Sequence, residues 1–538
     1  MSTPPRTVAR RTARHRVAAG AALAALTAGA LTTLGTVPAA AAPAPAPSAL
    51  GYDVTGDTGG LQAITRMTGA QAAWKAGTTG RGIDVALIDS GVAPVQGLTS
   101  GNVVNGPDLS FDSQNPHQPD HVDAFGHGTH MASLIVGRDA VQARPAGYVG
   151  AAPTQVVGMA PDARLINLKV ASADGGADVT QVIAAVNWVV EHADDPGFNI
   201  RVLSLSYGTN ADVSRQSWQT DPLSYAVEQA WRKGIVVVVA GGNDGRTTTT
   251  SLANPAMDPR VLAVGASDPR GTLGSSDDVV PGFATHGTNQ RHVDVVAPGV
   301  HVLGLKVPNS LVDVENPSAA VGSRFLRGSG TSQATAVVAG AAALLLQAHP
   351  EWTPDLVKAA LVAGARPFSG ASAQYRGSGL IDVTRAMAGP GSTGAQSAPA
   401  ATGTGSLELA RGDVHAVDPE DGAVLSGEQD VFGHPWDAAS WAQRTAAGTT
   451  WQGGQWMGHG WSGDGWGGSS WTAQTWQGRA WLDNSWTGRA WLGRAWLGRA
   501  WLDNGWSGRA WLSDSGWTGR AWLGRAWLDA GWSSAGWE

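Results

Sequence analysis

The feature that most constrains this chain is a series of short, unbroken apolar runs between residues 62 and 388. Strands buried on both faces of a sheet have this pattern, whereas strands with one exposed face alternate apolar and polar residues. The runs occupy 83–89, 164–170, 201–206, 234–242, 260–266 and 293–299. We therefore expect a sheet that is covered on both sides.

Longer amphipathic segments lie between these runs and predict the covering helices. One segment places Val179, Val182 and Val186 on a single helical stripe. Another begins with Thr353 as an N-cap and Pro354 in the first turn. The alternation predicts an α/β domain with a mostly parallel central sheet between helices. In such sheets, functional groups gather beyond the carboxyl ends of the strands.

The first 42 residues have the order of a secretory signal peptide. A basic stretch precedes an apolar run at 17–37, and small residues follow, which predicts cleavage near Ala41 or Ala42. The pair Arg10 and Arg11 hints at a twin-arginine signal, but no apolar residue follows it as usual, so ordinary secretion is favoured. We expect an extracellular protein, associated with the cell wall if its C-terminal tail binds there.

Composition excludes several classes of partner and chemistry. The chain has no cysteine, so disulfides, thiol catalysis and cysteine-based metal sites are excluded. A net charge of -7 gives no reason to expect nucleic acid as a partner. After the signal region no stretch of 18 apolar residues lacks charge, so no membrane span is expected once the signal is removed.

Changes in composition divide the chain further. We expect a leader at 43–61, a catalytic domain at 62–388, a linker and polar connecting segment at 389–435, and a tail at 436–538. The tail holds 20 of the 25 tryptophans, mostly five residues apart. Steps of five fit neither a helix nor a flat strand, and a small β-solenoid that turns a corner every five residues would suit them. Alternatives are exposed rings that bind carbohydrate or cell-wall material, and a glycine-rich, partly disordered tail.

Three places in the domain carry candidate chemistry. Asp89 ends the first buried run, His127 stands between glycines before an apolar helix, and Ser332 opens the apolar helix after 330. Each has a simpler interpretation: a carboxylate that caps a turn, a solvated loop histidine, and a hydroxyl that caps a buried helix.

A metal site is a further alternative. Four histidines and one carboxylate lie close together in the sequence: His117, His121, His127, His130 and Asp123. Their spacings match no zinc motif, so we expect no metal there.

Taken together, the three residues predict nucleophilic catalysis. A serine hydroxyl needs a base to remove its proton, and a histidine base needs a carboxylate to orient it. The flanking segments VALIDSGV, GHGTHMASLIVG and GSGTSQATAVVAG contain Asp89, His127 and Ser332 in the order Asp–His–Ser. Over roughly residues 62–388, the chain resembles the subtilisin-like serine peptidases, the subtilases.

The resemblance implies a three-layer subtilisin-like fold and a serine endopeptidase that hydrolyses proteins or peptides and requires no cofactor. It implies that Ser332 attacks, His127 transfers the proton, Asp89 orients the histidine, and Asn243 donates to the oxyanion. It also implies substrate-binding walls at Ser206, Tyr207, Gly208, Ala240, Gly241 and Gly242. Small residues there suit a roomy apolar pocket, so we expect broad cleavage after hydrophobic residues.

Several features depart from the family. Gln333 and Ala336 replace a methionine and a proline of the usual motif, and only about 20 residues precede the domain after cleavage, so the inhibitory pro-domain is expected to be absent. The loop 138–157 lacks clustered Asn and Asp, so structural calcium stays open but has no support in the sequence. The sequence also leaves two other functions open: a catalytically silent surface-binding protein, and a metallohydrolase built on the histidine cluster.

Overall fold

The computed structural model describes residues 57–114, 120–139, 145–152, 154–245, 251–391, 394–417, 423–461 and 472–473. The predicted signal peptide, residues 43–56 of the predicted leader and most of the tryptophan tail lie outside these residues.

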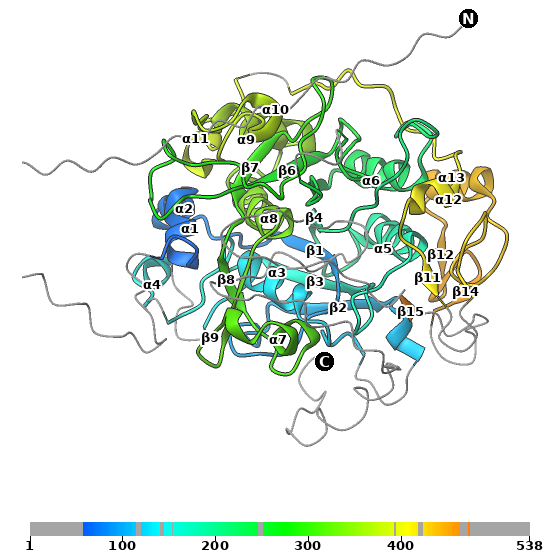
Figure 1. The fold of residues 1–538 in the computed structure, drawn as a ribbon, viewed down its shortest axis with the longest axis horizontal. Helices are drawn as coiled ribbons and strands as arrows, with labels where there is room; N and C mark the ends of the chain where they lie inside the picture. The colour runs from blue at the N-terminus through cyan, green and yellow to red at the C-terminus, as the bar shows by residue number, and fades with distance from the viewer. Residues whose placement is uncertain are drawn as a thin grey trace, which may run out of the picture. The chain divides into compact units, whose positions relative to one another are not determined.

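The centre of the fold is a seven-stranded sheet in which every pair of neighbours is parallel (Figure 1). In spatial order its strands are β2 (Val103–Asp108), β3 (Arg164–Lys169), β1 (Asp84–Asp89), β4 (Ile200–Leu205), β5 (Val236–Ala240), β6 (Leu262–Ser267) and β7 (Val295–Pro298). Six of the seven correspond to the predicted apolar runs. The predicted parallel α/β fold is confirmed.

Helices cover both faces of the sheet. The helices α3 (His127–Val136) and α8 (Thr331–Ala348) pack against each other and lie on one side of the strands in Figure 1. On the other side lie α5 (Val179–His192) and α6 (Pro222–Arg232). The predicted N-cap of α9 (Pro354–Gly364) is confirmed, because Thr353 Oγ1 accepts the backbone N–H of Leu356.

Smaller elements surround these layers. They are α1 (Leu61–Met67), α2 (Ala70–Lys75), α4 (Pro145–Val149), α7 (Leu311–Glu315), α10 (Ala373–Arg376), α11 (Val383–Ala386), β8 (Val302–Leu305), β9 (Ala320–Val321) and β10 (Phe325–Gly328). Within the described residues, α8 is long and apolar enough to cross a membrane, but 89% of it is buried in the molecule, as expected for a core helix.

Residues after 400 fold against the helical layer formed by α5 and α6. They form α12 (Leu407–Arg411), β11 (Ala416–Val417), α13 (Ala438–Ala447), β12 (Trp451–Gln452), β13 (Gln455–Trp456), β14 (His459–Gly460) and β15 (Thr472–Ala473). Figure 1 shows α12, α13 and β12 beside α5 and α6. We call residues 406–461 the docked segment. The proposed boundary at 436 between connecting segment and tail stays a prediction.

Three tryptophans of the docked segment hydrogen-bond to α5, two of them through one asparagine. Asn187 Oδ1 accepts the indole N–H groups of both Trp441 and Trp456, at 3.1 and 3.2 Å. The Trp451 indole N–H donates to the carbonyl of Ala184, at 2.9 Å. Because a buried N–H without a partner is costly, these bonds fix which turn of α5 each ring can cover.

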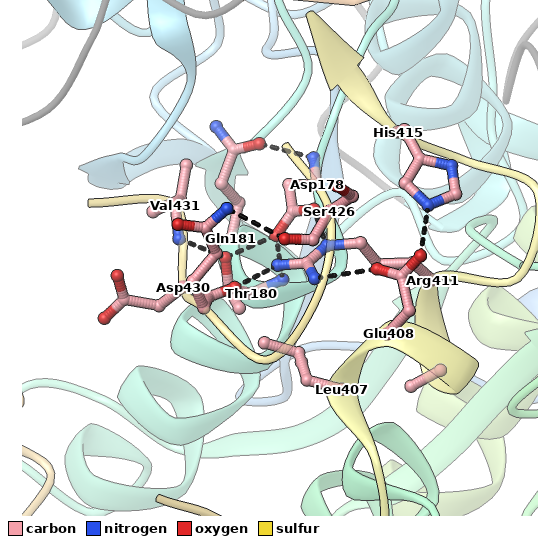
Figure 2. A network of polar contacts seen from close by, with 12 residues as sticks. Asp178, Thr180, Gln181, Leu407, Glu408, Arg411, His415, Ser426, Asp430 and Val431 are labelled. Carbon is pink, nitrogen blue, oxygen red and sulfur yellow. Dashed lines mark hydrogen bonds and ion pairs between the residues drawn. The ribbon is translucent and has the colours of Figure 1, made fainter. Parts of the chain in front are cut away.

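A buried arginine joins the docked segment to the start of α5 (Figure 2). Arg411 Nε donates to Asp178 Oδ2 at 2.7 Å, and both side chains are fully buried. Its other nitrogens donate to the carbonyls of Gly427 and Gln429. Asp178 is also the N-cap of α5, where its Oδ1 accepts the N–H of Thr180. The guanidinium therefore ties one loop and one helix end to the same carboxylate.

Replacing Arg411 should weaken the fold strongly. Arg411→Met leaves the Asp178 carboxylate buried without its cation, and breaking such a pair costs about 3–5 kcal/mol. The free energy of unfolding, measured by urea denaturation with far-UV circular dichroism, should fall by that amount. Lys233→Met is the matched control, because its ion pair with Asp194 is exposed and should contribute under about 1 kcal/mol. Equal losses in the two variants would contradict this interpretation.

Candidate active site

Three neighbouring strands end at one edge of the sheet, and several predicted site residues belong to these strand ends or directly follow them. Asp89 is the last residue of β1, and Ala240 is the last residue of β5. Between these strands lies β4, which ends at Leu205 directly before Ser206. Parallel neighbours end at a common edge, so these chain segments meet there.

Asp89 and His127 form the central contact of this edge. The Nδ1–H of His127 donates to the Asp89 carboxylate, 2.8 Å from Oδ1 and 3.0 Å from Oδ2. Both side chains are buried. In the neutral tautomer with its proton on Nδ1, the ring has its free lone pair on Nε2. This nitrogen can accept a proton from a nucleophile.

The position of His127 depends on how closely α3 approaches the end of β1. His127 is the first residue of α3, and the following Gly128 lies against Gly91, so that a Cβ at Gly128 would come within 2.1 Å of the Gly91 carbonyl oxygen. The preceding Gly126 has φ 109°, which a residue with a side chain rarely adopts. These glycines bring the imidazole within hydrogen-bonding distance of Asp89.

Asp123 holds the first turn of α3. Its carboxylate accepts the N–H groups of Gly126 and Thr129, at 2.6 and 2.8 Å, and the hydroxyl of Ser90 at 2.8 Å. Ser90 Oγ in turn accepts the N–H of Gly128, at 2.9 Å. Burial raises the pKa of Asp123, and the backbone bonds oppose that shift. A continuous set of hydrogen bonds therefore connects the helix that carries His127 to the residue after Asp89.

A buried lysine neutralises part of the negative charge near this edge. Lys169 Nζ lies 3.1 Å from Asp112 Oδ2 and donates to the carbonyls of Ser90 and Ala171. Burial disfavours the charged lysine, but the neighbouring carboxylates of Asp112, Asp108 and Asp123 outweigh that effect and raise its pKa. Lys169 therefore stays cationic beneath the carboxylates.

Ser332 stands in the first turn of α8, which packs against α3. The N-cap residue of α8, Gly330, has no side chain to cap the helix. Asn243, three residues after β5, caps it instead. Asn243 Oδ1 accepts both the N–H and the hydroxyl of Thr331, each at 2.8 Å. Among the described residues no hydrogen bond joins Ser332 to His127, and the Ser332 side chain is buried.

The predicted substrate walls lie at and directly after the ends of β4 and β5 and are buried. Some of their backbone N–H and C=O groups already form hydrogen bonds within the protein. Gly241 donates its N–H to Val264 O and accepts from Ala253, and Gly242 O accepts the N–H of Thr285. The Tyr207 side chain is buried, and burial together with the nearby Asp178 raises the pKa of its hydroxyl well above the usual value.

The residues of the histidine cluster identified in the sequence bind different partners in the structure. His127 binds Asp89, and Asp123 binds backbone N–H groups and Ser90. Burial, together with His127, lowers the pKa of His130 well below its usual value. His117 lies outside the described residues. Among those described, no three members of this cluster place donor atoms at mutual ligand distance.

Sequence reasoning did not single out Ser90 or Lys169, whereas it did single out Thr331 as a hydroxyl that could cap the buried helix. Ser90 follows Asp89 directly, so its position in the motif was the available signal. For Lys169 the available signal was a lysine within an apolar run that forms the strand beside β1. A lysine buried in such a run needs a partner for its charge.

Removing the Asp123 carboxylate should loosen the start of α3. Asp123→Ala deprives two backbone N–H groups and the Ser90 hydroxyl of their acceptor, and the loss of a cap alone costs about 0.5–2 kcal/mol. We expect a drop of about 2 kcal/mol in the free energy of unfolding, measured by urea denaturation, and a smaller drop for Asp123→Asn. Asp437→Ala, which removes the exposed cap of α13, is the control and should lose about half as much or less. A larger loss for Asp437→Ala would count against this role.

Comparisons with known proteins agree with these features. The chain matches the model of the Subtilase family across residues 80–395. It is 35% identical over 315 residues to the serine protease AprX of Bacillus subtilis (strain 168), covering 58% of this chain and 67% of that protein. It is 31% identical over 317 residues to subtilisin BL of Lederbergia lenta, covering 59% of this chain and 95% of that protein. A crystal structure of MycP1 with its N-terminal propeptide removed aligns with a TM-score of 0.44 and 28% identity, covering 60% of this chain and 96% of that one. The chain belongs to the subtilase family of subtilisin-like serine endopeptidases.

Proposed function

We propose that this serine endopeptidase cleaves peptide bonds with Ser332 as nucleophile, His127 as base and Asp89 as the residue that orients the base. The observation that carries the proposal is the bond from His127 Nδ1–H to buried Asp89, at the edge of the sheet where α8 also begins. This bond selects the tautomer whose Nε2 can accept the serine proton.

In the proposed reaction, Ser332 Oγ attacks the scissile carbonyl carbon as its proton moves to His127 Nε2. The same proton then passes to the leaving amine as the C–N bond breaks and the acyl-enzyme forms. Water, activated by His127 in turn, hydrolyses the ester and restores the serine. Asp89 stabilises the imidazolium at each stage without taking the proton itself.

The oxyanion is proposed to form beside the first turn of α8. The N–H of Ser332 points out of the helix N-terminus, where the helix dipole favours negative charge. The second donor is Asn243 Nδ2. Because Asn243 Oδ1 accepts from Thr331, the orientation of this amide is fixed before substrate arrives, and a preorganised donor stabilises the transition state most.

Substrate is proposed to bind as an extended strand between Ser206, Tyr207 and Gly208 on one side and Ala240, Gly241 and Gly242 on the other. Ala240 packs with Ala253 in a small apolar cluster, which supports a preference for hydrophobic residues before the cleaved bond. With the signal sequence as the supporting feature, we place the enzyme outside the cell, where the tryptophan tail would hold it on carbohydrate or cell-wall material.

Ser332→Ala should abolish peptidase activity. Without the nucleophile, kcat on a casein-type substrate should fall about 10⁶-fold, the loss that removal of the catalytic serine causes in this family. A fluorophosphonate probe should label the unmodified protein and not the variant. Residual hydrolysis near the original rate would remove the assignment, and an unlabelled but folded protein would favour a catalytically silent binding protein.

Thr335→Ser is the matched control, one turn further along α8, where the hydroxyl donates to the carbonyl of Thr331. It retains the hydroxyl and should keep activity within about twofold. Treatment with a chelator tests the metallohydrolase alternative. A metallohydrolase would lose activity with the chelator and keep it with the fluorophosphonate.

Asn243→Asp separates the two roles of this side chain. Aspartate keeps an acceptor for Thr331 but loses the donor, so kcat should fall by at least about 10²–10³-fold while the melting temperature stays close to that of the original enzyme. Asn243→Ala loses both roles, so kcat and the melting temperature should fall together. Full activity in Asn243→Asp would exclude Asn243 as the oxyanion donor.

A further inference from the structure

A second group of chemically active side chains lies in the docked segment, outside the residues that match the family. Asp430, His434 and His459 place one donor atom each within 4.8 Å of one another. Asp430 and His434 belong to the loop before α13, and His459 belongs to β14. From this cluster we propose that the docked segment binds one divalent transition-metal ion, with Zn²⁺ as the expected ion.

The loop that carries Asp430 is held in place by the Arg411 network. Arg411 donates to the carbonyls of Gly427 and Gln429, and the N–H of Val431 donates to Thr180 Oγ1 at 3.2 Å. Figure 2 shows the Asp430 carboxylate pointing away from the Arg411 guanidinium. Its Oδ1 accepts the N–H groups of Phe432 and His434, each at 2.9 Å. The carboxylate is therefore positioned before any ion binds.

The donor set selects the class of metal. Two imidazole nitrogens and one carboxylate oxygen suit Zn²⁺ and its first-row neighbours, whereas Ca²⁺ takes six to eight oxygens. Three protein donors leave at least one position for water. Binding would connect the 430–434 loop to β14, so the ion would fasten two parts of the docked segment that are about 25 residues apart in the chain.

Coordination requires a limited movement of His434. Donor atoms in a tetrahedral zinc site lie about 3.3 Å apart, since the bonds are about 2.0–2.1 Å long. His434 Nδ1 already lies 3.8 Å from Asp430 Oδ1. The rings of His434 and His459 stack with centroids 3.9 Å apart and an interplanar angle of 15°, so their lone pairs do not yet converge. His434 can turn out of the stack because its side chain is 46% exposed.

His459 supplies the less mobile nitrogen. Its ring packs beside Phe432, with centroids 5.2 Å apart, and Phe432 meets Trp461 edge to face at 4.8 Å. This aromatic packing shields one side of the cluster, and the exposed His434 forms the other side. The ion would thus bind at the surface of the docked segment, with access from solvent.

The test is a calorimetric titration of the full-length protein with Zn²⁺ after removal of metals by EDTA. We expect one equivalent to bind, and we expect His434→Ala and His459→Ala to weaken that binding at least about tenfold, since even changes to groups behind metal ligands cost that much. Zn²⁺ should also raise the melting temperature of the unmodified protein by several degrees and that of the two variants by much less. Ca²⁺ at the same concentration should do neither.

His415→Ala is the matched control, because His415 lies in the same segment and pairs with Glu408 instead of the cluster. It should bind Zn²⁺ as the unmodified chain does. If His459→Ala does not fold, His434→Ala decides alone, since its half-exposed ring contributes little to the core. Failure of the unmodified chain to bind, equal binding in His434→Ala, or loss of binding in His415→Ala would each overturn the proposal.

Discussion

A fully buried carboxylate at the end of β1 determines how the surrounding structure is arranged. Asp89 has no contact with solvent, so its charge has to be balanced within the protein. The N–H of Ser90 and the Nδ1–H of His127 provide that balance. For His127 to reach it, α3 has to begin against the backbone of Gly91, and Asp123 and Ser90 hold that first turn. The arrangement that stabilises the charge also orients the imidazole.

The docked segment also contacts the chain that follows β4 at this edge of the sheet. Thr209, which follows the predicted substrate wall, donates its hydroxyl to the carbonyl of Ala410 at 2.6 Å. Arg411, the next residue, binds Asp178 at the start of α5. The segment that follows the peptidase domain therefore supports the backbone against which substrate is proposed to bind.

Much of the sheet could be predicted from the sequence because strands buried on both faces need unbroken apolar runs. The strand β2 was missed since Asn105, Gly106 and Pro107 interrupt its run, and only its pairing with β3 makes it a strand. The three motif residues Asp89, His127 and Ser332 could be singled out because reactive groups stand next to glycines at element ends. The hydroxyls at the start of α8 suggested a local cap, but Asn243, about 90 residues earlier, supplies it. Such contacts depend on tertiary packing, which spacing along the chain does not encode.

In the part that the structure describes, tryptophans spaced five residues apart belong to an antiparallel meander or directly follow it. Trp451, Trp456 and Trp461 belong to, or directly follow, three successive short strands, and β12–β13–β14 pair antiparallel. The strands begin every four residues, at 451, 455 and 459, so a step of five moves each tryptophan on by one position: Trp451 is the first residue of β12, Trp456 is the second of β13, and Trp461 follows β14. Trp456 is buried against Asn187, while the turn residues Gly453, Gly454 and Gly458 adopt positive φ. Asn187 on α5 accepts the indole N–H of Trp456 from the meander and that of Trp441 from α13, so two separate elements of the docked segment meet at one buried polar acceptor.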